Sequence, residues 1–521
     1  MMSMRLSRRQ TLAYTGAGLL AAGSGLRPSR ALSAPRKGGV LKVALGFGAT
    51  SDSLDPSIVS NDMMLAVNYS VYNYLTEIGP DGSLLPELAE SWEAASGAKT
   101  WTFRLRRGVS FHDGKSFGAD DVLATIAYHK RPDSTSGVKS LVDQIVDMRK
   151  DDEHTVVIEL DGGNADFPYL TSAFHLAMKA SRDGAIDPFD GIGTGPFRLE
   201  SFEPGIRVGL TRNPDYWKEG RGHFDGIELV TVMDPSARAN ALAAGEVHVN
   251  YNPDRKSVEL AARNPAIRVV SVTGNQHFTI PMLVTVPPFD NYHVRNALKW
   301  SIDREKLVDT ILQGYGKVGN DNPVGFANRY RATEEELPQR VYDPERAKFH
   351  LSQAGLSSLK VPIHPSEAAF NGCVDMALLI ADSARAAGIE VEVIREPEDG
   401  YWDNVWMKKP WSFSHWGGRP TEDWLFTMIY YSKATWNETL WSNARFDELL
   451  LAARSELDEA LRREMYVEMQ QILHDEGGQV VPVFADWMFA CSTNVQYDPV
   501  ISSSANMDGM RFSERWWFED A

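Results

Sequence analysis

Segments typical of β-strands alternate with segments typical of α-helices along this chain, and this alternation restricts the fold more than any other feature. Residues 40–45 are apolar with one polar break, which predicts a strand. Residues 101–105 alternate bulky and polar side chains, as a half-buried strand does. A helix is predicted over 120–130, because acids at its start and bases at its end complement the helix dipole. Such alternation favours an α/β fold.

The same patterns continue to the C-terminus. Further strands are predicted at 154–160, 225–232, 389–394, 480–483 and 486–490. Further helices are predicted at 62–75, 235–244, 292–302, 303–313, 343–354, 375–387 and 455–475. In the last helix, Ser455 and Asp458 have the spacing of a capping box. Its predicted buried face consists of Leu457, Leu461, Met465, Met469 and Ile472.

Length and charge limit the class of protein. A chain of 521 residues is too long for one core, so two or three domains are expected. The 53 basic and 70 acidic residues give a net charge of −17, which opposes binding to nucleic acid or to an anionic membrane surface. No stretch of eighteen apolar residues is present, so no membrane insertion is predicted.

The first residues have the layout of an export signal. A cationic start with Arg8 and Arg9 precedes a weakly apolar run, and the small-residue site Ala31-Leu32-Ser33 follows. The arginine pair predicts a twin-arginine signal over residues 1–33; an ordinary secretory signal with an accidental arginine pair is the alternative. No cysteine lies near the cleavage site, so no lipid anchor is expected. The mature protein is predicted to be soluble in the periplasm of a Gram-negative bacterium.

The small number of cysteines and the absence of known catalytic motifs argue against metal sites and covalent chemistry. Cys373 and Cys491 are too few for a four-thiolate zinc site, and we expect two separate buried thiols, although the periplasm permits a disulfide. No phosphate-binding loop, H-E-x-x-H motif or G-x-S-x-G elbow is present. The pairs His112-Asp113 and His474-Asp475 are more typical of turns and helix ends. No catalytic residue, metal site or cofactor is predicted.

Several segments, in order, resemble the family 5 solute-binding proteins of ABC importers, whose members bind peptides, opines or nickel. They are LPELAESW at 85–92, TFRLRRGV at 102–109, FHDG at 111–114, ADDV at 119–122, GTGPF at 193–197, RNPDYW at 212–217, PFD at 288–290, VRNAL at 294–298 and IDR at 302–304. Each match alone is weak, but together with the C-terminal return they cover nearly all of the predicted mature chain.

The resemblance implies the α/β fold of two-lobed periplasmic binding proteins, of the cluster C type, with two hinge crossovers. Lobe one would comprise residues 38–273 and 486–521, with an extra subdomain at about 56–184. Lobe two would comprise residues 274–485. In such proteins the ligand is buried between the lobes and trapped by hinge closure.

The segment 413–420 resembles the family's ligand strand and loop, in which an aromatic and small residues precede an aspartate. In peptide binders of the family that aspartate holds the α-ammonium of the ligand. Here Arg419 stands at the matching position. A guanidinium repels an ammonium and holds a carboxylate, phosphate or sulfonate, so the resemblance implies an anionic solute. The alternative is an ion pair of Arg419 with Glu422 or Asp423.

Other candidate ligand residues lie on the same segment, on the first crossover and after the first strand. They are His415, Trp416, Gly417, Gly418, Asn275, His277, Phe278, Asn61 and Asp62. Trp416 would stack on a ligand or pack in the core. Gly417 and Gly418 allow close backbone approach or a bulge. Asn275, His277 and Phe278 have structural alternatives, Asn61 and Asp62 would otherwise cap a helix, and Trp402 and Trp406 are more typical of a hydrophobic face.

The resemblance therefore implies a monomeric binding subunit that captures a short peptide, an opine-like conjugate or another anionic solute. Its partners would be the transmembrane permease subunits of the importer. Three rival interpretations remain: a metal-chelate binder of the same family, a periplasmic hydrolase on this scaffold, and a chaperone-like or sensory protein.

Overall fold

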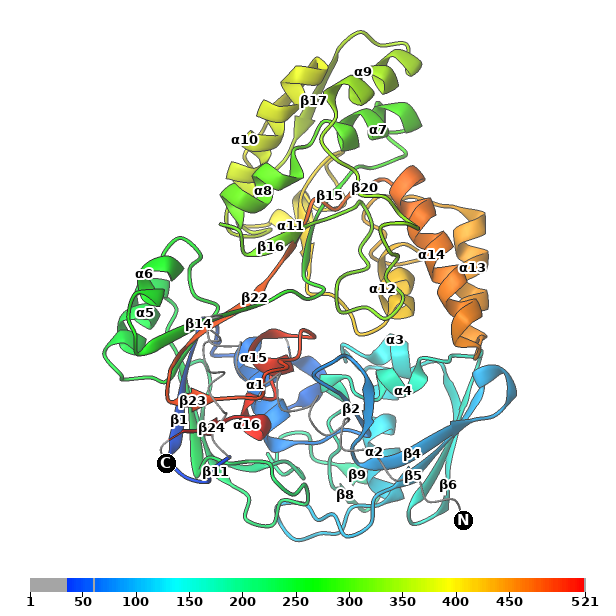
Figure 1. Ribbon diagram of the computed structural model, residues 1–521. Coiled ribbons are helices and arrows are strands. Elements are labelled where there is room, and N and C mark those ends of the chain that lie inside the picture. Colours follow the sequence, from blue (N-terminus) through cyan, green and yellow to red (C-terminus); the bar gives the residue numbers. More distant parts are fainter. Residues whose placement is uncertain (1–34, 60, 520–521) are drawn as a thin grey trace, which may run out of the picture. The chain divides into compact units, whose positions relative to one another are not determined.

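Seven strands form the largest sheet of the computed structural model, which describes residues 35–59 and 61–519 (Figure 1). The order is β10-β11-β12-β1-β13-β22-β14; β1 is parallel to β12 and β13, and the other neighbours are antiparallel. The strands are β1 (Val40–Leu45), β10 (Phe197–Glu203), β11 (Arg207–Arg212), β12 (Gly226–Thr231), β13 (Val249–Tyr251), β14 (Ile267–Val272) and β22 (Trp487–Ser492). The predicted export signal at 1–33 lies outside the described residues.

Apolar side chains of this sheet pack against helix α1 (Asp62–Val71), which is predominantly buried. Leu41 and Val43 of β1 are fully buried beside Met63 and Val67 of α1. Helices α5 (Pro235–Ala243) and α6 (Val258–Ala262) follow β12 and β13 along the chain. The strand–helix alternation of the sequence therefore produces a mixed α/β layer structure here.

A second core surrounds a four-stranded antiparallel sheet within residues 89–160. Its order is β4-β5-β7-β6, and its strands are β4 (Ala89–Ala94), β5 (Thr100–Leu105), β6 (Ile145–Asp152) and β7 (Thr155–Leu160). Helix α2 (Ala119–Lys130) covers it, with Val122 and Ile126 in the same core as Phe103. The alternating pattern of β5 is confirmed, because Trp101, Phe103 and Leu105 are buried.

A five-stranded sheet is formed by segments after residue 276, with the order β16-β21-β15-β19 and β20 beside β15. Its strands are β15 (His277–Pro281), β16 (Gly316–Val318), β19 (Ser414–Trp416), β20 (Gln479–Val480) and β21 (Val483–Ala485). The chain passes from the seven-stranded sheet to this sheet between β14 and β15 and returns between β21 and β22 (Figure 1).

Asp486 joins these two crossings. It lies between β21 and β22, and its carboxylate accepts hydrogen bonds from the hydroxyls of Ser271 (2.6 Å) and Thr273 (2.7 Å) at the end of β14. Bonds to a carboxylate are stronger than bonds between neutral groups. The two connections are therefore tied side by side.

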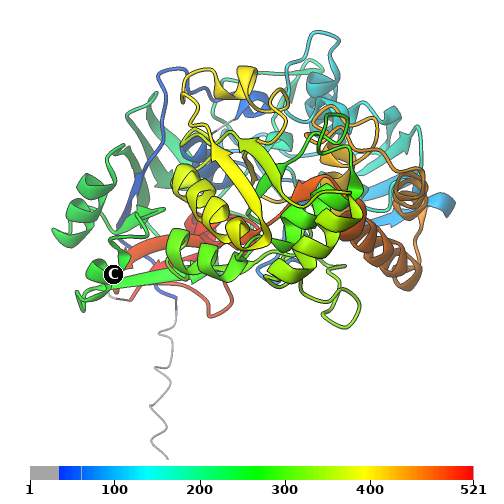
Figure 2. The ribbon, with the colours of Figure 1, turned by 90° about the horizontal axis from the view of Figure 1, so that it is seen from above.

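Helices share one core with the parallel pair β17 (Leu359–Ile363) and β18 (Ile389–Val393), and Figure 2 shows helices beside the pair from above. They are α7 (Tyr292–Trp300), α8 (Arg304–Ile311), α9 (Pro344–Gln353) and α10 (Cys373–Ala384). A separate core holds α12 (Glu422–Ile429), α13 (Ala444–Ser455) and α14 (Glu459–Glu476). No helix in the described ranges has the length and apolarity needed to cross a bilayer.

The motif VRNAL and the lysine after it bind the C-terminal end of helix α14. Arg295, Asn296 and Lys299 on α7 donate hydrogen bonds to the carbonyls of Glu476 (3.0 Å), Asp475 (3.2 Å) and His474 (2.9 Å), respectively. The last carbonyls of a helix have no partner within the helix, and cations stabilise that end. The motif therefore holds α7 against the C-terminus of α14.

The predicted helix 455–475 begins later than expected. Residue Ser455 ends α13, and Asp458 is the N-cap of α14, where its carboxylate accepts the N–H groups of Ala460 and Leu461. Leu457 lies in the break between the helices and Leu461 in the first turn of α14; each is 46 % exposed, so the prediction that both are buried is wrong. Met469 is fully buried, as predicted.

The two cysteines are buried and free, which confirms the prediction of two separate thiols. Cys373 belongs to the core around β17 and β18, and Cys491 to the core of the seven-stranded sheet. Burial raises the pKa of the Cys491 thiol to about 12, so its reactive thiolate form is rare at neutral pH.

Candidate functional site

The pairing of β15 with β19 brings four predicted site residues together. His277 lies opposite Trp416, and Phe278 lies opposite His415. His415 is exposed, whereas the residues on either side of it in β19 are buried. Because side chains alternate along a strand, His415 points to one face of this sheet and Trp416 to the other.

His277 and Phe278 are both buried beside the site. His277 is fully buried, its Nδ1 lies 2.8 Å from the carbonyl oxygen of Asn275, and burial lowers its pKa to about 4. The ring of Phe278 stacks on Phe370 with centroids 3.8 Å apart. Both residues therefore have the surroundings of core side chains, which is the structural alternative considered for them.

Four tryptophans extend from β19 in a continuous series that we call the tryptophan row: Trp402, Trp406, Trp416 and Trp436. Successive ring centroids are 5.7, 6.4 and 5.9 Å apart. The two ends, Trp402 and Trp436, are 40 % and 43 % exposed, whereas Trp416 is 8 % exposed. The row therefore combines a buried centre with aromatic faces open at both ends.

A buried carboxylate, Glu438, fixes the centre of the tryptophan row. The indole N–H groups of Trp406 and Trp416 donate to it at 2.7 and 3.2 Å, and the hydroxyl of Thr279 donates at 3.0 Å. Gln479 donates to the same carboxylate. Burial raises the pKa of Glu438 although these donors favour its charged form. Nothing in the local sequence marks this residue, and sequence reasoning missed it.

Gly418 and Asn275 shape the loop after β19. Gly418 has φ +82°, and a Cβ added there would lie 2.4 Å from the Cβ of Asn275, so only glycine fits. The amide of Asn275 donates to the carbonyl of Arg419 (3.3 Å) and accepts the N–H of Ala327 (2.8 Å). Gly417 is exposed, with open space where a Cβ would be. Asn275 thus positions the loop that carries Arg419.

The guanidinium of Arg419 has no carboxylate partner in the part of the chain that the structure describes. It donates to the carbonyl of Gly418 (2.6 Å), contacts the sulfur of Met428 (3.8 Å) and lies 5.7 Å from the ring centre of Trp424. Burial lowers its pKa to about 10, so it stays charged at neutral pH. A partly buried cation with unused N–H donors is complementary to an anion.

The acidic neighbours in sequence, Glu422 and Asp423, are the first two residues of α12, and their carboxylates bind other segments. Asp423 pairs with Arg454, with Nε and Oδ1 3.0 Å apart. Glu422 accepts the N–H of Tyr330 at 2.6 Å. The alternative in which Glu422 or Asp423 neutralises Arg419 is therefore wrong for this structure.

Glu422 yields a prediction about pH. Burial raises its pKa to about 7, so the folded protein holds a proton that the unfolded chain, with an ordinary pKa near 4.5, releases. The stability contributed by this proton is complete below about pH 4.5 and is lost as the pH rises to 7. We expect Glu422→Gln to be near neutral at pH 4 and stabilising by about 1–3 kcal/mol at pH 8. Urea unfolding at both pH values measures this, and equal effects at both would contradict it.

Asn61 and Asp62 lie at the start of α1. The side-chain oxygen of Asn61 accepts the N–H of Met64 (3.1 Å), and its amide donates to Asp52 (2.5 Å). Burial raises the pKa of Asp62, which hydrogen-bonds Tyr251. Within the described ranges, no hydrogen bond or ion pair joins either residue to segment 415–419. Asn61 caps the helix, and a ligand contact by either residue stays a prediction.

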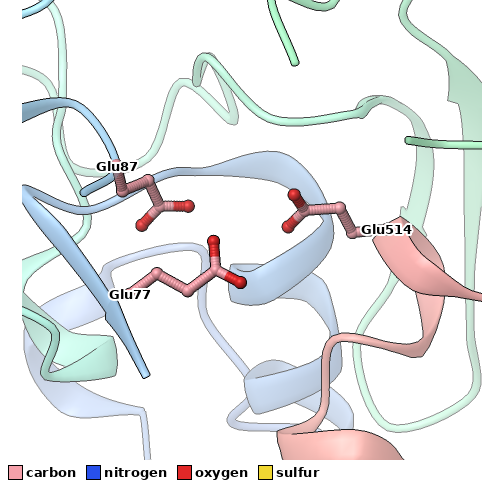
Figure 3. A group of neighbouring side chains, drawn as sticks. All are labelled: Glu77, Glu87 and Glu514. Atoms are coloured by element: carbon pink, nitrogen blue, oxygen red, sulfur yellow. The ribbon is translucent and has the colours of Figure 1, made fainter. Parts of the chain in front are cut away.

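Three buried carboxylates, Glu77, Glu87 and Glu514, converge in another part of the chain (Figure 3). The group has the spacing of a metal site, but the ammonium of Lys218 lies 2.6, 2.9 and 2.9 Å from their oxygens. Arg511 pairs with Glu87 and Glu514, and Arg515 pairs with Glu77. Lys218, Arg511 and Arg515 together balance the three carboxylates, so we assign the cluster a structural role.

Comparison with known proteins identifies the class. Residues 83–438 match the family described as bacterial extracellular solute-binding proteins, family 5 Middle. The chain therefore belongs to the family 5 solute-binding proteins, as its motifs predicted.

Two curated relatives and one solved structure illustrate this. Di/tripeptide-binding protein 1 of Pseudomonas aeruginosa (strain UCBPP-PA14) is 28 % identical over 449 residues, which cover 78 % of this chain and 82 % of that protein. Glutathione-binding protein GsiB of Pectobacterium atrosepticum is 26 % identical over 448 residues, covering 82 % and 85 %. The structure of AgaA from A. tumefaciens R10, in complex with agropinic acid, superimposes with a TM-score of 0.75 at 21 % identity, covering 93 % and 99 %. The fold is thus that of the two-lobed periplasmic binding proteins.

Proposed function

We propose that this chain is the periplasmic solute-binding subunit of an ABC importer and that its solute is a small, peptide-like acid. The observation that carries the proposal is the partly buried Arg419 guanidinium, which has no carboxylate partner among the described residues. A carboxylate bound there would satisfy N–H donors that the protein leaves free and would balance a partly buried charge.

The surroundings favour a solute that also has an apolar or planar part. The open ends of the tryptophan row, Trp402 and Trp436, offer aromatic surface near β19, and His415 is exposed between them in the sequence. Aromatic side chains provide large contact areas with little loss of conformational freedom. In this proposal Arg419 orients the acid and the tryptophans hold the remainder of the solute.

The names of the relatives agree with an acidic solute. Dipeptides, glutathione and agropinic acid all carry carboxylates. A free α-ammonium, by contrast, needs an acidic partner, and this chain has Arg419 at the position where peptide binders of the family have an aspartate. We therefore favour acids whose amino group is substituted or distant from the carboxylate, such as opine-like conjugates, over unmodified short peptides.

The solute would be captured by hinge closure between two lobes. Lobe one would comprise residues 38–273 and 486–521, and lobe two residues 274–485. The crossings tied by Asp486 would form the hinge. Solute contacts made only when the lobes approach would shift the population toward the closed form. The closed monomer would then deliver the solute to the transmembrane permease subunits, after export directed by the twin-arginine signal.

A thermal-shift comparison of acids with their amides tests the proposal. Dipeptides, glutathione and agropinic acid would each be compared with a derivative in which the carboxylates are converted to amides. We expect at least one acid to raise the melting temperature while its amide does not, because only the acid gains from Arg419. Stabilisation by amides and acids alike would contradict an anion site. Stabilisation by nickel–histidine alone would favour the metal-chelate interpretation instead.

A further inference from the structure

A buried carboxylate, Asp166, lies where the predicted extra subdomain meets lobe two. It is 1 % exposed and directly precedes α4 (Phe167–Leu170). Its two oxygens pair with guanidinium groups of lobe two, Arg329 at 3.1 Å and Arg462 at 2.9 Å. One side chain of the extra subdomain thus contacts two separate segments of lobe two, the loop after β16 and helix α14.

Backbone contacts reinforce this junction. The N–H of Ala165 donates to the carbonyl of Arg454 in α13 at 2.7 Å. A Cβ added at Gly163 would lie 2.6 Å from the Cβ of Ser455, so the two chains approach closely. The ring of Tyr169 lies 5.3 Å from the guanidinium carbon of Arg329. The junction therefore combines charge pairing and main-chain bonding with one close approach of the two chains, at Gly163 and Ser455.

A cavity of about 330 Å³ adjoins the junction and has walls from both sides of it. Trp92, Trp101 and Tyr169 line it from the extra subdomain, and Arg329, Leu457 and Arg462 line it from lobe two. This explains the exposure of Leu457, which borders the cavity instead of the helical core. Apolar packing is interrupted beside Arg329 and Arg462, the two partners of Asp166, because both line this cavity.

The junction is connected to the loop that carries Arg419. Asp423 in the first turn of α12 pairs with Arg454, whose carbonyl accepts the Ala165 N–H. Trp424, beside the Arg419 guanidinium, packs against the core of the four-stranded sheet. The first turn of α12 therefore contacts the Arg419 loop on one side and the extra subdomain on the other.

We propose that Asp166 is the latch that holds the extra subdomain on lobe two in the arrangement seen here. When the two pairs with Arg329 and Arg462 are broken, the segment around Ala165 separates from α13 while each core stays folded. The further consequence, that the latch positions the Arg419 loop for its solute, rests on the proposed function.

Hydrogen–deuterium exchange of the full chain, without any solute, tests the latch. We expect Asp166→Asn to speed exchange of the segment containing Ala165 at least tenfold, with exchange in β5 and β7 unchanged, and to increase the radius of gyration in solution scattering. Glu459→Gln is the matched control, because Glu459 borders the same cavity but is 63 % exposed and lies 3.4 Å from Arg329. It should leave both measurements unchanged.

Arg329→Gln provides a second variant, since this half-exposed arginine can be replaced without unfolding a core. It should increase exchange at the Ala165 segment in the same direction as Asp166→Asn, but less, because Arg462 remains. Unchanged exchange at that segment in both variants would overturn the proposal. Equal acceleration throughout the four-stranded sheet would also overturn it, since Asp166 would then stabilise the extra subdomain itself. Neither result depends on whether the solute is an acid.

Discussion

Replacing Lys218 by methionine is expected to lower the free energy of unfolding by about 3–5 kcal/mol, because it leaves buried carboxylates without their shared cation. Lys218 is 13 % exposed, and Glu77, Glu87 and Glu514 are between 0 and 7 % exposed. Although burial by itself lowers the pKa of Lys218, the carboxylates hold it well above the ordinary value. Urea unfolding followed by tryptophan fluorescence at pH 7.5 measures the loss.

The control for this prediction is an ion pair on the surface. Lys42 lies 3.3 Å from Glu228, and the two side chains are 45 % and 36 % exposed. Lys42→Met should cost at most about 1 kcal/mol, because solvent screens exposed pairs. The contacts of the cluster indicate that it holds the C-terminal segment to β2 (Thr76–Ile78). If Lys218→Met lowered the free energy of unfolding no more than Lys42→Met, this role would be contradicted.

Arg419→Ala is expected to weaken binding of an acidic solute tenfold or more while the protein stays folded. The guanidinium holds no carboxylate of the protein in the described part of the chain, so its removal leaves no acid unpaired. Its loss therefore affects the anion-binding capacity rather than the core. Isothermal titration with an acid that stabilises the wild-type protein gives the affinity, and circular dichroism reports the fold.

Arg445→Ala serves as the matched control for charge. Arg445 lies in the same predicted lobe but pairs with Glu468 at 2.8 Å on the surface, and it is 51 % exposed. This variant should bind the acid with wild-type affinity. Wild-type affinity in the Arg419→Ala protein as well would show that the solute lies elsewhere.

The bounds of a helix or strand could be predicted where the sequence pattern of that segment alone determines them. The helix over 120–130 and the strand at 101–105 were placed within a residue, because burial on one face leaves a regular pattern in the sequence. The helix predicted from Ser455 failed, because Ser455 and Asp458 are both acceptable N-caps and only packing selects Asp458. The order of the family motifs correctly predicted the fold class.

The candidate site was predictable only in part. The segment containing Trp416 and Arg419 was selected by resemblance, and pairing with β15 brought His277 and Phe278 beside it. Glu438 was missed, because a buried carboxylate held by indoles has no local signature. The partners of Glu422 and Asp423 were also unpredictable: proximity suggested Arg419, but the direction of α12 turns both toward other segments.

Mass spectrometry of the compound released from natively purified protein tests the central claim most directly. The wild-type protein and its Arg419→Ala variant would be purified without a denaturation step and then unfolded to release any bound solute. We predict one small acid in near-stoichiometric amount from the wild-type protein and much less of it from the variant. A stoichiometric solute without an acidic group, or equal loading of both proteins, would contradict the assignment of Arg419 as the anion-binding residue.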